Sequence, residues 1–152
     1  MAPSSDKPAD SASAVFDAIH EIMHLYRAQQ YRELRAGPHD VTHIEAKVLG
    51  YFARHPGATQ SDLVARSGRD KAQLARLVRG LRDKGWLEAT VDETDRRSTR
   101  LHVTEAGKAL ARTLQRSGEH LAQVAVAGLD EGERRQLLAL LEKVRVTFDT
   151  QA

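Results

Sequence analysis

The sequence contains no cysteine. This absence excludes disulfide bridges, zinc sites built on thiolates and any sensor that works by oxidising a thiol. Aromatic residues make up only 5% of the chain, which is too few for a surface that binds carbohydrate or single-stranded nucleic acid mainly by stacking. No apolar run approaches the roughly 20 residues of a membrane-spanning helix, and residues 1–14 lack the apolar core of a secretion signal. We therefore expect a cytoplasmic protein without membrane association.

The length of 152 residues is that of one ordinary domain, and it suffices for a hydrophobic core. Residues 1–12 are rich in Ser, Ala, Pro and Asp, and we expect them to form a disordered tail. We expect residues 13–152 to form a single domain.

Positive charge is concentrated in two segments, although the formal net charge is only +2. Residues 69–84 carry the first cluster and residues 96–100 the second. The basic side chains are Arg69, Lys71, Arg76, Arg79, Arg82 and Lys84, then Arg96, Arg97 and Arg100. Locally basic surface on a nearly neutral chain suggests attraction to a polyanion, whereas charge alone fits a solvated helix face equally well.

Helical periodicity and capping signals predict four helices in the first half of the chain. A long helix is expected over about 13–35, and Gly37 and Pro38 end it. Thr42 and Glu45 form a capping box that opens the second helix. Similar signals at Thr59 and Asp70 open two further helices, of which the second runs to about Lys84. Its apolar stripe consists of Leu74, Leu77, Val78 and Leu81.

The periodicity changes after Gly85. Residues 86–91 and 99–103 have the alternation of strands, with Leu101 and Val103 on one side, and the polar segment 92–98 joins them as a hairpin tip. Two more helices follow, from Thr104 to about Gly128 and from Asp130 onward. The order of elements is four helices, a hairpin and two helices.

The helix over residues 70–84 carries the candidate DNA-reading surface. When its apolar stripe is buried, the exposed side carries Lys71, Ala72, Gln73, Arg76 and Arg79. In helix-turn-helix proteins the N-terminal half of such a helix enters the major groove. Arginine can bind guanine, glutamine can pair with adenine, and alanine can contact a thymine methyl group. The alternative is an ordinary surface helix that happens to carry arginines.

Two stretches together resemble the MarR family of winged helix-turn-helix regulators. Residues 92–107, Asp-Glu-Thr-Asp-Arg-Arg-Ser-Thr-Arg-Leu-His-Val-Thr-Glu-Ala-Gly, are similar to the family's wing signature. Residues 71–87 are similar to its recognition helix and the exit from it. The resemblance covers about residues 40–110.

The resemblance implies a mainly α fold with a small β-hairpin wing. The winged helix-turn-helix lobe would span residues 42–104, with the wing at 86–104. The helices at 13–36 and 106–150 would make a homodimer, which fits their apolar stripes. A symmetric dimer implies a pseudo-palindromic operator.

The resemblance also places residues on double-stranded DNA. Arg97 at the wing tip would enter the minor groove, with Arg96 beside it and Asp95 orienting an arginine within the wing. Ser61, Arg69 and Lys71 would contact phosphate. The full predicted DNA-binding set is Ser61, Arg69, Lys71, Ala72, Gln73, Arg76, Arg79, Arg96 and Arg97.

A small aromatic or anionic effector is a further implication of the resemblance, because members of the family often bind such ligands beside the dimerisation helices. The residues placed to line that pocket are His20, Met23, His24, Tyr26 and Arg27. His20 and His24 also share one helix face and could clamp a divalent ion, with Glu21 or His43 as a third ligand. We expect polar surface histidines instead, and no metal or other cofactor.

The prediction is a sequence-specific, ligand-responsive repressor. The chain has no phosphate-binding glycine loop, nucleophile elbow or zinc-hydrolase motif, so we do not expect an enzyme. The alternatives are a non-specific architectural DNA-binding protein, a metal-responsive regulator and a protein-interaction module that no longer binds DNA.

Overall fold

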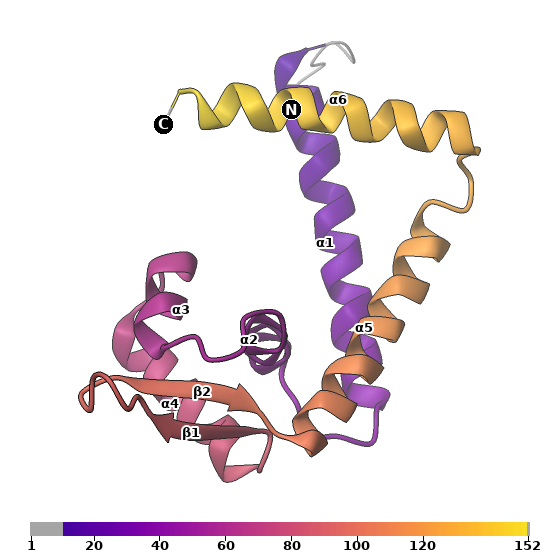
Figure 1. Cartoon of the computed structure of the whole chain (residues 1–152). Helices are drawn as coiled ribbons and strands as arrows, with labels where there is room; N and C mark the ends of the chain where they lie inside the picture. Colours follow the sequence, from indigo (N-terminus) through magenta and orange to yellow (C-terminus); the bar gives the residue numbers. More distant parts are fainter. Residues whose placement is uncertain (1–10, 152) are drawn as a thin grey trace, which may run out of the picture. The chain divides into compact units, whose positions relative to one another are not determined.

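The computed structural model describes residues 11–151, so most of the expected N-terminal tail lies outside the described residues. The chain divides into two compact units at Gly118 and Glu119. The elements of the described residues are α1 (Ala12–Ala36), α2 (His43–Arg54), α3 (Gln60–Ser67), α4 (Lys71–Asp83), β1 (Leu87–Val91), β2 (Thr99–Val103), α5 (Glu105–Ala125) and α6 (Glu131–Asp149). The predicted fold class, mainly α with one β-hairpin, is confirmed (Figure 1).

Side-chain caps define where the helices begin, as the sequence signals indicate. The Thr42 backbone N–H donates to Glu45 Oε2 at 2.8 Å, and the Glu45 N–H donates to the Thr42 hydroxyl, which opens α2. Thr59 and Asp62 form the same reciprocal box at the start of α3. Asp70 caps α4 by accepting a hydrogen bond from the Gln73 N–H. These contacts satisfy amide groups that a helix leaves without a partner in its first turn.

The hydrophobic core of the first unit lies between α2, α3, α4, the hairpin and the start of α5. The side chains of Leu49, Phe52 and Leu81 are fully buried, and Leu74 is 1% exposed. Around them lie Val48, Leu63, Val78, Leu87, Leu101, Val103 and Leu110. This core fixes α4 and the hairpin on one scaffold.

A short third segment extends the two-stranded hairpin. Strands β1 and β2 pair antiparallel with Ala89 opposite Leu101. The Gly57 N–H donates to the Leu101 carbonyl, and the Leu101 N–H donates to the Ala58 carbonyl, both at 3.0 Å. Gly57 has φ +79°, a conformation that favours glycine because it lacks a Cβ. The loop between α2 and α3 therefore continues the sheet on the far side of β2.

A partly buried ion pair joins the start of α2 to the end of α4. Lys84 Nζ lies 2.9 Å from Glu45 Oε1 and donates to the Asp40 carbonyl at 2.7 Å. Burial alone would raise the pKa of Glu45, but the hydrogen bond from the Thr42 N–H and the contacts with Lys84 lower it overall. Glu45 is therefore a carboxylate that remains charged at neutral pH and holds the two helices together.

Two long helices have no buried residue in the single chain. Neither α1 nor α6 has one. Their exposed apolar side chains include Val15, Ile22 and Leu25 on α1, and Leu137, Leu138, Leu140 and Phe148 on α6. Among the described residues, no helix has both the length and the apolar character to cross a membrane.

Candidate nucleic-acid interface

The predicted reading helix is α4, and its two sides differ in burial. Leu74, Val78 and Leu81 face the core, and Ala75, Leu77 and Gly80 beside them are half-buried. The exposed side chains include Lys71, Ala72, Gln73, Arg76 and Arg79. Helix α3, which carries the exposed Ser61, packs against α4. The two helices thus form a helix-turn-helix whose second helix offers a polar, cationic side to solvent.

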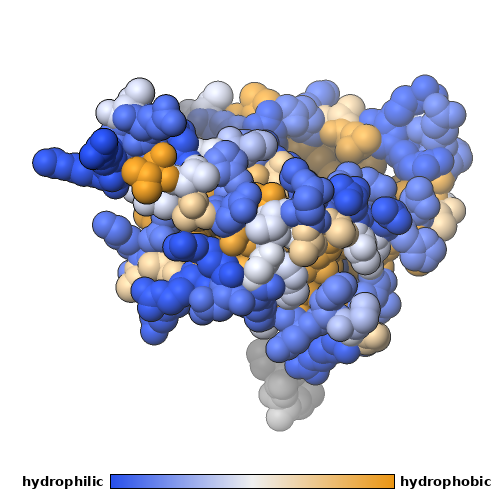
Figure 2. All heavy atoms as spheres, turned by 60° about the horizontal axis from the view of Figure 1, so that its bottom comes forward, coloured by the Kyte–Doolittle hydropathy of each residue, from blue (hydrophilic) through white to orange (hydrophobic). Residues whose placement is uncertain are grey.

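Six predicted DNA-binding cations are exposed and not engaged by the protein. Within residues 11–151 their charged groups make no side-chain hydrogen bond or ion pair, in contrast to Lys84 and Arg100, which both do. The six are Arg69, Lys71, Arg76, Arg79, Arg96 and Arg97. The view with the lower part of Figure 1 turned toward the reader shows a largely hydrophilic face (Figure 2). Unpaired guanidinium and ammonium groups on such a surface are available to phosphates and base edges.

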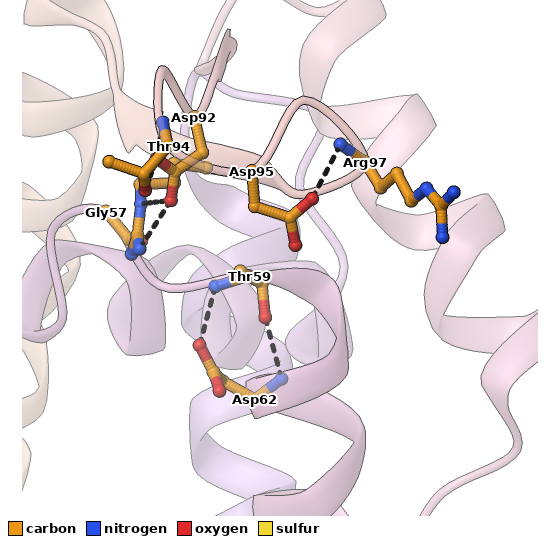
Figure 3. A network of polar contacts seen from close by, with 8 residues as sticks. Gly57, Thr59, Asp62, Asp92, Thr94, Asp95 and Arg97 are labelled. Carbon is orange, nitrogen blue, oxygen red and sulfur yellow. Dashed lines mark hydrogen bonds and ion pairs between the residues drawn. The ribbon is translucent and has the colours of Figure 1, made fainter.

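The wing tip is shaped by backbone hydrogen bonds that involve Asp95. Asp95 Oδ1 accepts a hydrogen bond from the Arg97 N–H at 3.0 Å, and the Ser98 N–H donates to the Asp95 carbonyl. In Figure 3 the Arg97 guanidinium extends away from the Asp95 carboxylate. Asp95 thus contacts the backbone of Arg97 rather than its charged group, and it fixes the turn from which that side chain projects.

A second carboxylate, Asp92, stands at the base of the wing loop. Its side chain is 12% exposed, and Oδ2 lies 2.7 Å from Arg100 Nη2. Its Oδ1 accepts hydrogen bonds from the hydroxyl and the N–H of Thr94 (Figure 3). These contacts with Thr94, followed by those with Arg100, lower the pKa of Asp92 to about 2. The pairing of Asp92 with Arg100 could not be predicted from the sequence, because it depends on the hairpin register.

A cavity of about 970 Å³ that is open to solvent lies within the first unit, between the C-terminal part of α1, α2, α3 and α5. Apolar side chains dominate the lining, among them Leu34, Val41, Ile44, Leu110 and Leu114. The residues predicted to line an effector pocket, His20, Met23, His24, Tyr26 and Arg27, lie earlier on α1, and none of them lines this cavity. Helical periodicity alone could not show where these five residues lie relative to the cavity.

His43 is the polar residue of the cavity with an unmet hydrogen-bonding need. Its Nε2 is buried and has no partner among the described residues. Its ring lies 5.0 Å from the ring of Tyr31. Burial, followed by the positive charges of Lys47 and Arg27, lowers the pKa of His43. The imidazole is therefore neutral near pH 7, in surroundings of positive potential.

Within the described part of the chain, no three His, Asp or Glu side chains are grouped closely enough to hold a metal ion. His20 and His24 are both exposed on α1.

Comparison with known proteins identifies relatives that match most of the chain. The sequence profile described as the MarR family matches residues 39–98. The Bacillus subtilis HTH-type transcriptional regulator YybA is 31% identical over 88% of this chain and 89% of its own length. The Pseudomonas putida HTH-type transcriptional repressor NicR is 25% identical, over 92% and 90% of the two chains.

A solved structure of a protein bound to DNA is also similar to this chain. A mutant of Staphylococcus aureus MepR bound to an oligodeoxyribonucleotide superposes with a TM-score of 0.62 and 26% identity, over 91% of this chain and 98% of that one. These relatives are named as regulators rather than as enzymes. Together with the helix-turn-helix and the hairpin, the comparisons show that the chain belongs to the MarR family of winged helix-turn-helix transcriptional regulators.

Proposed function

We propose that the protein is a sequence-specific repressor that binds a pseudo-palindromic DNA operator as a homodimer in the cytoplasm. The observation that carries the proposal is the set of six exposed, unengaged cations on α4, on its N-terminal approach and on the wing. A helix-turn-helix and a wing that expose unpaired cations have the chemistry needed to contact both grooves of a duplex.

Each part of the surface has a distinct role in this proposal. Ser61, Arg69 and Lys71 contact phosphate oxygens and set the orientation of the protein, whereas side chains on the exposed side of α4 read base edges in the major groove. These reading side chains are Ala72, Gln73, Arg76 and Arg79. Arg97 enters the minor groove, and Arg96 lies beside it on the groove edge or phosphate.

The homodimer is supported by the apolar side chains that α1 and α6 leave exposed. Ile22 is 62% exposed and Leu138 is 67% exposed in the single chain. Large apolar side chains that are left exposed along a whole helix favour an interface over a solvated face. A two-fold axis would present two copies of α4 to successive half-sites about one helical turn apart.

The name of one relative and the expected binding of a dimer across the operator both favour repression. NicR is named as a repressor, and a dimer that occupies an operator blocks access to that DNA. The competing hypothesis is an architectural protein that uses the same cations without reading sequence. The two differ in discrimination between duplexes, since phosphate contacts alone give strong salt dependence and little sequence preference.

Selection from a pool of random duplexes tests the proposal. We expect enrichment of a sequence with two inverted half-sites whose centres lie about 10 base pairs apart, because two symmetric copies of α4 must enter the major groove on one side of the DNA. A pool that shows no enriched motif after several rounds would contradict the repressor and favour the architectural protein.

The cavity beside α2 is the place where we propose that a small aromatic or anionic effector binds. The buried His43 Nε2 offers one hydrogen bond, and the nearby Lys47 and Arg27 favour negative charge. Apolar side chains around His43 suit an aromatic ring. An effector that binds more tightly to a conformation unable to bind DNA would lower operator affinity.

Benzoate and the neutral benzyl alcohol are matched probes of this effector site. We expect millimolar benzoate to release the selected duplex in an anisotropy titration, and benzyl alcohol to release much less. His43→Phe, which keeps the aromatic ring but removes the free nitrogen, should bind the duplex normally and lose most of the response. An equal response of wild type and His43→Phe would exclude His43 from the effector site.

A further inference from the structure

Arg100 occupies a position from which it joins three separate segments. It belongs to β2, but its guanidinium contacts the end of one strand and a loop far away in sequence. Its Nε donates to Asp92 Oδ2 at 2.8 Å, and its Nη1 donates to the Gly57 carbonyl at 3.0 Å. Asp92 directly follows β1, and Gly57 lies in the loop that leads to α3. One planar group thus connects both arms of the wing with the helix-turn-helix.

The contacts around Arg100 fix the orientation of its guanidinium. The backbone of Arg100 bridges to Thr59, the residue that caps α3. Asp92, held by Thr94, offers one carboxylate oxygen to two nitrogens of the guanidinium. A guanidinium has donors in a fixed planar arrangement. It can therefore bind Asp92 on one edge and the Gly57 carbonyl on the other only in one orientation.

We propose that Arg100 is a positioning residue that holds the wing at a fixed place relative to α3 and α4, so that Arg97 meets the minor groove while α4 occupies the major groove. The inference rests on the proposed DNA-binding function. Arg100 itself is engaged within the protein, in contrast to Arg96 and Arg97, whose guanidinium groups are not.

Stability alone does not account for this arrangement. The Arg100 side chain is 49% exposed, and ion pairs at such positions contribute little to the free energy of unfolding. The hairpin already has its own backbone pairing and a buried side from Leu101 and Val103. What the guanidinium adds is a restraint on where the wing loop lies.

A double-mutant cycle with Arg97 separates positioning from other roles. We expect Arg100→Gln to weaken binding to the selected operator roughly tenfold. In an Arg97→Ala background the same change should have an effect of less than about twofold, because no minor-groove contact is left to position. In an Arg76→Ala background it should keep its full effect. A loss of equal size with and without Arg97 would overturn the proposal.

Arg100→Lys distinguishes positioning from a direct phosphate contact. Lysine keeps the charge but cannot bridge Asp92 and the Gly57 carbonyl at once. We expect Arg100→Lys to bind about as weakly as Arg100→Gln, and restored wild-type affinity would show that only the charge matters. Lys108→Gln removes an exposed ion pair of the same 2.7 Å length, to Glu105 on α5, and should leave operator affinity unchanged.

Hydrogen exchange in the free protein tests the restraint without DNA. The Leu101 and Gly57 amides join β2 to the loop before α3, and we expect Arg100→Gln to speed their exchange while the amides of α2 keep wild-type protection. Unchanged exchange at Gly57 and Leu101 would contradict the inference even if Arg100→Gln weakened operator binding. A wild-type protein that fails to discriminate between duplexes would instead refute the proposed function.

Discussion

Replacing Arg76 with alanine is expected to weaken operator binding by about 1–3 kcal/mol, or roughly 5- to 150-fold in Kd. Arg76 lies on the exposed side of α4, in its N-terminal half, and its guanidinium is not engaged within the described residues. A bidentate contact with guanine would supply a free energy of this size. The loss should be confined to one base pair per half-site, so the variant should tolerate any base there.

A panel of operators with single base-pair changes, titrated against wild type and Arg76→Ala, measures this effect. Arg82→Ala is the matched control, because Arg82 is also an exposed arginine of α4 but lies in its last turn. We expect Arg82→Ala to bind every duplex nearly as wild type does. If Arg76→Ala weakened binding to all duplexes by the same factor, Arg76 would contact phosphate and not a base.

The second large effect concerns the junction between the wing and α5. A Cβ on Gly107 would overlap the Trp86 carbonyl oxygen and lie 2.7 Å from Val103 Cγ1. The surrounding backbone cannot easily move, because the Thr104 N–H donates to that same carbonyl and the Thr104 hydroxyl donates to the Gly85 carbonyl. We expect Gly107→Ala to lower the free energy of unfolding by about 2–4 kcal/mol.

Gly118→Ala is the control for this prediction, because Gly118 also lies within α5 and nothing is within 4 Å of its Cβ position. Alanine favours a helix over glycine by up to about 1 kcal/mol, so this variant should be as stable as wild type or more stable. Urea unfolding monitored by circular dichroism gives both values. A Gly107→Ala protein as stable as wild type would mean that α5 does not start against Trp86 as described.

Local signals in the sequence were sufficient for much of the fold. The capping box of Thr42 and Glu45 and the cap at Asp70 depend on residues three positions apart, so the linear sequence contains them. The alternation of Leu101 and Val103 depends only on the two-residue period of a strand. Their burial confirms the face that the pattern predicted.

Contacts between distant segments could not be predicted in the same way. Glu45 is also the partner of Lys84, 39 positions later, and Arg100 meets a carbonyl 43 positions earlier. Neither pairing has a period or a motif, because both arise only after helices and strands have packed. The cavity is a similar case, since its lining depends on how α1, α2 and α5 pack together.

An anisotropy titration of the wild-type protein tests the central claim most directly. The selected operator and a scrambled duplex of the same length and composition would be compared at about 150 mM salt. A sequence-specific regulator should bind the operator some ~10³-fold more tightly than the scrambled duplex. Equal Kd values for the two duplexes would contradict base reading by α4 and leave only attraction to the phosphate backbone.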